Sequence, residues 1–246
     1  PHVTPFNYAE NRPISGVDLH GLQYLDHNLK FQMDQTSITV TGELTVGVKI
    51  LNLSSEKISQ EAIDFHMDKA SSVFDASYWG VGYSSVSFNP NSGELFSDKM
   101  NLYAKNLDIN FEYTGTITSL NGIEKGDVVM ALVDDLKGEI HGKAGEGAGF
   151  AYLVEAGVFN EKNKVPTHEF GHGIGGLLDI GKAGYERFLM AFNKSGDGYE
   201  LRNSDRTDIV YTLIYNAGRR KYVNQPASEV DTRKLIQDML DRFSKN

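Results

Sequence analysis

The segment 167–179 constrains this chain more than any other stretch, because it fixes how two histidines must lie. It reads Thr-His-Glu-Phe-Gly-His-Gly-Ile-Gly-Gly-Leu-Leu-Asp. His168 and His172 are four residues apart, so a helix places both imidazoles on one face, one turn from each other. Gly175 and Gly176 end such a helix readily, since glycine adopts positive φ at low cost. A turn at that point brings the following residues back toward the histidines.

This pattern is typical of a metal site. Zinc takes a small tetrahedral shell of nitrogen and oxygen ligands, which two convergent imidazoles begin to build. In an H-E-x-x-H pattern the glutamate, here Glu169, is not a ligand but the general base toward the attacking water. No histidine follows His172, so any downstream ligand must be a carboxylate. Asp179 is the first candidate, and Glu186 and Glu200 are its rivals.

The pattern H-E-x-x-H-x-x-G followed by a third ligand resembles that of the metzincin zinc metallopeptidases. That family places its third ligand where this chain has Leu178, and Asp179 comes one residue later. Members carry a methionine under the metal, which the resemblance assigns to Met190; simple core packing is the equal alternative. Some members have a tyrosine two residues further on that assists the oxyanion. This chain has Phe192 there, and Tyr199 is a candidate substitute.

The resemblance implies a hydrolase that uses Zn²⁺ and acts on a protein substrate. His168, His172 and Asp179 would hold the metal. Glu169 would take a proton from the water that attacks a peptide carbonyl, and would then pass it to the leaving amine.

A second resemblance lies near the N-terminus. Rhs/YD-repeat proteins close their conserved shell with a segment of the form Tyr-x-x-Asn-x-Pro-Ile-x-x-x-Asp-Pro-x-Gly-Leu, after which a variable toxin domain begins. Seven residues follow that order and spacing, with Leu19 in place of the usual second proline: Tyr8, Asn11, Pro13, Ile14, Asp18, Gly21 and Leu22. The resemblance implies two parts, the tail of the shell at 1–24 and a zinc metallopeptidase toxin domain at 25–246.

This second resemblance also implies delivery into a target cell by a bacterial secretion system, and a cognate immunity protein in the producing cell. Two other interpretations stay open. The chain could be an ordinary secreted metallopeptidase with no toxin role, or a non-catalytic module whose histidines bind a metal for structure alone. The glutamate at 169 argues against the last of these, because a structural site needs no base.

Composition excludes several classes of function. The 246 residues carry a net charge of −9, which argues against broad binding to nucleic acid or to anionic membranes. The absence of cysteine excludes disulfides, thiolate metal ligands and a cysteine nucleophile. No apolar run reaches the length of a membrane span.

Periodicity predicts an α+β fold. Alternation at 37–53 indicates one or two strands, with a possible turn at Gly42-Glu43, and an apolar stripe predicts a helix over 59–76 capped by Ser59. Further strands are predicted at 108–117, 127–135, 138–144 and 149–154, whereas 77–108 carries no clear pattern. Segment 208–215 fits either a strand or a helix, and 228–243 is predicted to be a helix that packs on the domain.

This order of elements is that of the metzincin N-terminal subdomain. The resemblance therefore implies a mixed twisted sheet with a backing helix, an active-site helix and a small C-terminal helical subdomain. Segment 138–144 is the candidate for the antiparallel edge strand that pairs with extended substrate. His141 in this segment is a substrate contact, a metal contact or an ordinary exposed strand histidine. His66 is expected to be a hydrogen-bonded histidine of the core or its boundary.

Overall fold

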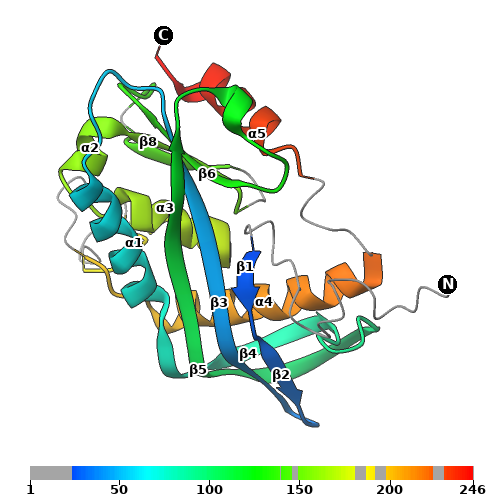
Figure 1. Ribbon diagram of the computed structural model, residues 1–246. Coiled ribbons are helices and arrows are strands. Elements are labelled where there is room, and N and C mark those ends of the chain that lie inside the picture. Colours follow the sequence, from blue (N-terminus) through cyan, green and yellow to red (C-terminus); the bar gives the residue numbers. More distant parts are fainter. Residues whose placement is uncertain are drawn as a thin grey trace, which may run out of the picture.

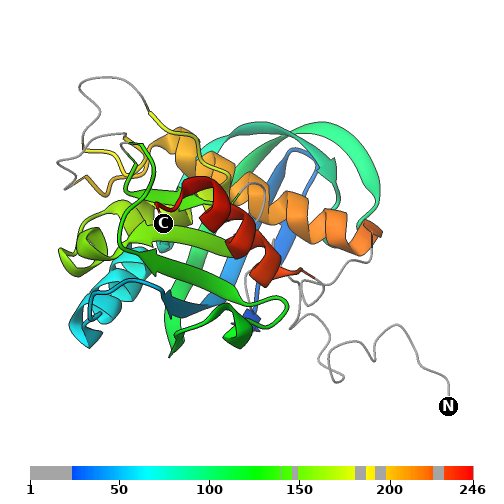
Figure 2. The same cartoon turned by 90° about the horizontal axis from the view of Figure 1, so that it is seen from above.

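The computed structural model consists of one mixed, curled sheet with helices on both faces (Figure 1; Figure 2). It describes residues 24–138, 140–145, 149–180, 187–191, 198–223 and 230–245. The predicted α+β class is confirmed. Most of the proposed shell tail, residues 1–23, lies outside the described residues.

Strand β3 (Ser37–Asn52) is the spine of the sheet. It runs parallel to β5 (Leu95–Ile117) on one side. On its other side three strands pair with it in succession: β2 (Lys30–Met33), β1 (Tyr24–His27) and β6 (Val128–Val133). The possible turn at Gly42 is absent. Gly42 has a φ of +109° at an irregularity in the pairing with β5, so the glycine permits a bulge within one long strand.

The segment without a clear pattern, 77–108, is largely strand. Strand β4 (Ala76–Phe88) pairs antiparallel with β5, and the two form a long hairpin that curls away from the rest of the sheet (Figure 1). The strand predicted at 108–117 is therefore only the last part of β5. Serine, asparagine and glycine occur throughout the hairpin, and they mask the alternation that normally reveals a strand.

The other half of the sheet leads to its edge. Strand β6 runs parallel to both β3 and β8 (Ala151–Glu155), and all its residues are buried, which confirms the central strand predicted there. Strand β7 (Gly142–Ala144) pairs antiparallel with β8 and ends the described strand order. An antiparallel strand at the edge was predicted from 138–144, although the strand begins only at Gly142.

Helices cover the two faces with separate cores. Helix α1 (Gln60–Phe74), capped by the Ser59 side chain as predicted, shares the larger core with α3 (Val165–Gly175) and α4 (Asn203–Val223). Alternate residues of β6 divide between the faces: Val128, Met130 and Leu132 face the larger core, whereas Val129, Ala131 and Val133 face a smaller one. Helix α5 (Thr232–Phe243) closes the smaller core. Two short helices, η1 (Leu120–Gly122) and α2 (Ala156–Asn160), complete the elements.

The C-terminal helices differ in part from expectation. Segment 208–215, which was ambiguous, lies within α4, and α4 packs against β4, β5 and α3. Helix α5 packs against β6 and β8 instead. In the described residues the two helices therefore cover different faces of the sheet and do not form a helical subdomain of their own. None of the described helices has the length and apolar character needed to span a membrane.

Candidate metal centre

Helix α3 brings the two histidines together, and its ends explain why it is short. Pro166 lies in the first turn, where its missing N–H leaves no hydrogen bond unmade. The Asn163 side chain accepts a hydrogen bond from the Val165 N–H at 3.3 Å. Gly176 ends the helix with a φ of +59°, and its N–H donates to the carbonyls of Gly171 and His172. The turn predicted at the paired glycines is confirmed.

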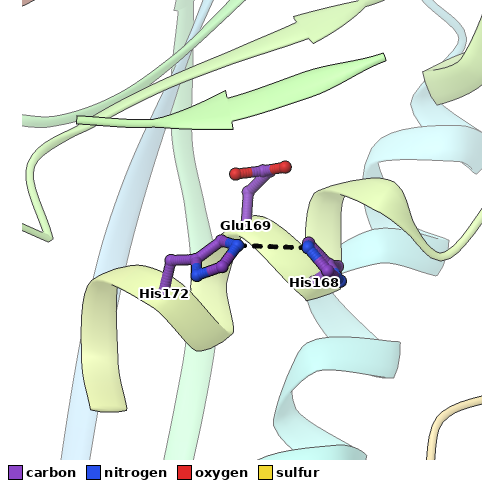
Figure 3. Close-up of side chains that lie close together, drawn as sticks. All are labelled: His168, Glu169 and His172. Carbon is purple, nitrogen blue, oxygen red and sulfur yellow. Dashed lines mark hydrogen bonds between the residues drawn. The ribbon is translucent and has the colours of Figure 1, made fainter. Parts of the chain in front are cut away.

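Each histidine is fixed by a backbone carbonyl. The Nδ1 atom of His168 lies 2.9 Å from the carbonyl oxygen of Leu189, and that of His172 lies 2.6 Å from the carbonyl oxygen of Leu177. A carbonyl can only accept, so each Nδ1 carries the hydrogen and each Nε2 presents a lone pair. The two Nε2 atoms are 3.1 Å apart (Figure 3). Histidines that bind metals are held in this way by their second nitrogen.

Asp179 completes the group. Its Oδ1 atom lies 2.9 Å from Nε2 of His168 and 3.3 Å from Nε2 of His172. The rival Glu200 pairs instead with Arg187, at 3.5 Å between Oε2 and Nε. The other rival, Glu186, lies outside the described residues. Asp179 is therefore the carboxylate that the turn after α3 carries to the histidines.

The spacing of these three atoms suits a tetrahedral metal. Ligands at about 2.0–2.1 Å from a tetrahedral ion lie about 3.3 Å from one another. The three separations, 2.9, 3.1 and 3.3 Å, are close to that value. When these imidazoles are protonated, their Nε2–H groups donate to Asp179, and the contacts with His168 and His172 hold the pKa of Asp179 well below its usual range. Burial opposes a charge on His172, but its contacts with Asp179 and Glu169 outweigh burial and raise its pKa. The two imidazoles and the carboxylate could therefore hold a cation.

The carboxylate of Glu169 does not lie between the two imidazoles. Its carboxylate projects toward the edge of the sheet (Figure 3), where a Cβ added to Gly142 would lie 2.8 Å from Oε1. The Glu169 side chain is 5% exposed, and burial raises its pKa, although His168 and His172 draw the pKa down. One ligand atom from each of His168, Glu169 and His172 lies within 4.8 Å of the others. Glu169 therefore lies beside the two histidines, close enough to act on a group held between them.

The segment 187–191 packs against helix α3 beside the candidate centre. Met190 is fully buried, and a Cβ added to Gly171 of α3 would lie 2.8 Å from its sulfur. The buried ammonium of Lys164 donates to the carbonyls of Ala191 at 3.0 Å and Phe188 at 3.4 Å. Met190 thus belongs to the core and lies against the helix of the two histidines, and its role under a metal stays a prediction.

Other candidate residues take different places. His66 is fully buried with Nε2 at 2.8 Å from the Phe159 carbonyl oxygen, so the expected hydrogen-bonded core histidine is confirmed. His141 pairs with Glu155 at 2.6 Å. The ring of Tyr199 packs beneath the Lys69 ammonium, whose Nζ is 4.2 Å from the ring centroid. Phe192 lies outside the described residues.

Three supporting features were not anticipated from the sequence: the carbonyl oxygens of Leu177 and Leu189, the buried Lys164, and the glycine at 142. Backbone carbonyls have no signature, since every residue carries one. Gly142 did leave a signal, because a glycine inside a strand often marks a close approach by another group.

Searches against protein-family models and against curated proteins find no match to this chain.

Proposed function

We propose that this chain is a zinc-dependent endopeptidase with a metzincin-like arrangement. One observation carries the proposal: Nε2 of His168, Nε2 of His172 and a carboxylate oxygen of Asp179 converge, while Glu169 stands beside them. A purely structural metal site has no use for a buried carboxylate that approaches the ligands without joining them.

The residues divide the chemistry among them. His168, His172 and Asp179 would hold the ion, and a bound zinc ion supplies Lewis acidity toward water and a carbonyl oxygen. Glu169 is buried, and it accepts no hydrogen bond from the residues that the structure describes. Its carboxylate is therefore available to take a proton from the attacking water and to deliver it to the departing amine.

The edge strand beside Glu169 supports a polypeptide substrate. The Gly145 N–H donates to β8, and the His141 carbonyl accepts from it. Hydrogen bonding alternates along an antiparallel strand, so the backbone groups of Gly142 and Ala144 point away from β8. An extended substrate could add to this edge as a further strand. Pairing there would hold a peptide bond next to Glu169, because Gly142 lies against its carboxylate.

A toxin role is the finer part of the proposal. It rests on the order and spacing of residues 8–22, which resemble the end of an Rhs-type shell. On this proposal the peptidase is delivered to a competing cell, and the producer is protected by an immunity protein. A neighbouring gene for a small inhibitor would support this role over that of an ordinary secreted peptidase.

The test combines metal analysis with hydrolysis of an unfolded protein such as casein. Wild-type protein should hold about one zinc ion per chain and cleave casein. Glu169→Gln should keep the zinc but lose about 10²–10⁴-fold in rate, as expected when a general base is removed. Asp179→Ala should lose or greatly weaken zinc binding.

Glu200→Gln is the matched control, because it removes a nearby carboxylate that pairs with Arg187. It should keep both the zinc and the activity. Full activity in Glu169→Gln would refute the assigned base. A wild-type protein that takes up no zinc, even after reconstitution, would refute the proposed function as a whole.

A further inference from the structure

A cavity lies beside α1 and β4, and its lining includes neither Glu169 nor any of the three proposed metal ligands. Its volume is about 840 Å³, and its walls come from α1, β4, the first turn of α4 and the segment 198–201. Cavities of roughly 300–1,000 Å³ commonly bind small organic molecules. The size is therefore suited to a ligand much larger than a single inorganic ion.

The wall of this cavity is rich in cations, although the chain carries a net charge of −9. Arg187 forms an ion pair with Glu200, with 3.5 Å between Nε and Oε2. The other acidic group in the wall, Asp75, lies against Asp108, and after burial it is the main cause that raises the pKa of Asp108. No carboxylate of the described residues forms an ion pair with either of the remaining cations, which are Lys69 and Arg206. Within the described part of the chain, these two positive charges in one wall thus lack an anion.

Aromatic rings hold these two cations in place. The Lys69 ammonium lies over the ring of Tyr199, and the Arg206 guanidinium lies over the ring of Trp79, with 5.7 Å between its carbon and the ring centroid. Cation–π contact orients a charge but leaves its N–H donors free. The Nε atom of Arg206 is buried and has no hydrogen-bond partner among the residues that the structure describes. A buried donor without an acceptor is uncommon, and an anion bound in the cavity would supply one.

We propose that this cavity binds an organic anion. Its carboxylate or phosphate lies between Lys69 and Arg206 and accepts a hydrogen bond from the Nε–H group of Arg206. Its apolar body packs on the side chains of Val73 and Leu201, which line the same cavity. The two cations supply charge-assisted hydrogen bonds, and the apolar wall supplies contact area. This site is independent of zinc and of peptide hydrolysis.

Trp79 makes the test direct, because it is the only tryptophan in the chain and forms part of the cavity wall. Tryptophan fluorescence of the full chain is titrated with N-acetylphenylalanine, with its neutral amide, and with phenyl phosphate. We expect a saturable change with the anions, and binding of the amide at least about tenfold weaker, since a hydrogen bond to a charged group is lost. Added salt should weaken the binding of the anions. Tighter binding of the phosphate or of the carboxylate identifies which anion the cavity prefers.

Two variants locate the binding. Arg206→Gln and Lys69→Gln should each lower the affinity for the anions by about tenfold. Lys105→Gln is the matched control, because it removes an exposed cation outside the cavity and should change nothing. Thermal unfolding of each variant shows whether it is folded. If one variant does not fold, the other still tests the proposal. Equal affinity for the acid and the amide would overturn the proposal. So would unchanged affinity in both variants, or the absence of both a fluorescence change and a calorimetric signal with every anion.

Discussion

Gly142 shows how tightly the residues around the candidate base Glu169 are packed. A Cβ at this position would lie 2.5 Å from a methyl carbon of Val165 and 2.8 Å from Oε1 of Glu169. Neither atom can remain where it is if a methyl group is added, and Val165 belongs to the first turn of α3. The absence of a side chain at 142 is therefore what lets the edge strand lie against Glu169.

We expect Gly142→Ala to displace Glu169 while leaving the metal ligands in place. Casein hydrolysis should fall at least about tenfold, zinc content should be unchanged, and stability should fall by about 1–3 kcal/mol, the usual cost of overpacking. Urea unfolding, zinc analysis and hydrolysis measure the three effects. Gly157→Ala is the control, because its added carbon meets only one atom, at 3.5 Å. Wild-type activity in Gly142→Ala would contradict this view of Glu169.

His66 links a single residue to the pH dependence of stability. Its Nε2–H donates to the Phe159 carbonyl, and its Nδ1 is buried without a partner among the described residues. Burial lowers the pKa of His66 from 6.5 to about 4, although the hydrogen bond to Phe159 opposes this. The folded pKa is thus below the unfolded one, so the unfolded chain binds more protons between these values. Stability is therefore lost as the pH falls through that window.

We expect His66→Gln to reduce this loss. At about 1.4 kcal/mol per tenfold change in proton affinity, the gap between the two pKa values is worth about 3 kcal/mol. Urea unfolding between pH 4 and 7, with a chelator present, should show that much less change in the variant than in the wild type. His141→Gln replaces a part-exposed histidine and should keep the acid-side loss. A wild-type pH profile in His66→Gln would refute the assignment.

The sequence was informative about residues whose side-chain type performs the chemistry. The four-residue spacing of His168 and His172 and the paired glycines after them were enough to anticipate the convergence with Asp179. The partners on the far side of each imidazole could not be anticipated. They are carbonyls of Leu177 and Leu189, and only the path of the backbone, not the type of side chain, decides where a carbonyl points.

At the scale of elements, α3 and β8 pack unusually closely because a glycine faces a tyrosine. Tyr152 of β8 is fully buried, and its hydroxyl donates to the Gly149 carbonyl at 3.1 Å. A Cβ at Gly173 of α3 would overlap that hydroxyl, and it would lie 2.8 Å from the ring carbon that bears it. Gly173 therefore sets the distance between the helix of the two histidines and the sheet.

We expect Gly173→Ala to destabilise the protein by about 1–3 kcal/mol through overpacking. Combining it with Tyr152→Phe, which removes the overlapping oxygen, should recover part of that loss. Urea unfolding of both single variants and of the double variant measures the coupling between the two sites. If the losses in unfolding free energy of the two single variants simply add in the double variant, helix α3 does not pack against this hydroxyl.

Elements were predictable where the hydrophobic pattern of the segment is clear. Helix α1 and its cap at Ser59 follow from such a pattern, and β6 follows from its continuous apolar run. The hairpin of β4 and β5 was missed because long-range pairing, not local composition, makes a strand of a segment rich in serine, asparagine and glycine. Helix α4 was ambiguous over 208–215, since the periodicity of so short a window does not separate strand from helix.

At the scale of the whole molecule, the candidate metal centre connects a helix with two segments that follow it in the chain. Helix α3 supplies the two histidines, the turn after it supplies Asp179, and the segment 187–191 holds His168 through a carbonyl. That segment is also bound to the start of α3 by Lys164. Occupancy of the centre should therefore stabilise the global fold rather than one loop, because unfolding separates all of these groups.

The measurement that tests this connection is the free energy of unfolding with and without zinc. A ligand that binds only the folded state stabilises it by about 2.7 kcal/mol at a free concentration one hundred times its Kd. We expect this increase in the wild type and in Glu169→Gln, which keeps every proposed ligand. It should vanish in His168→Ala, where one ligand is missing and the Leu189 carbonyl loses its donor. Magnesium at the same concentration is the control, since it prefers oxygen ligands. An equal zinc effect in His168→Ala would show that zinc binds elsewhere in the folded chain.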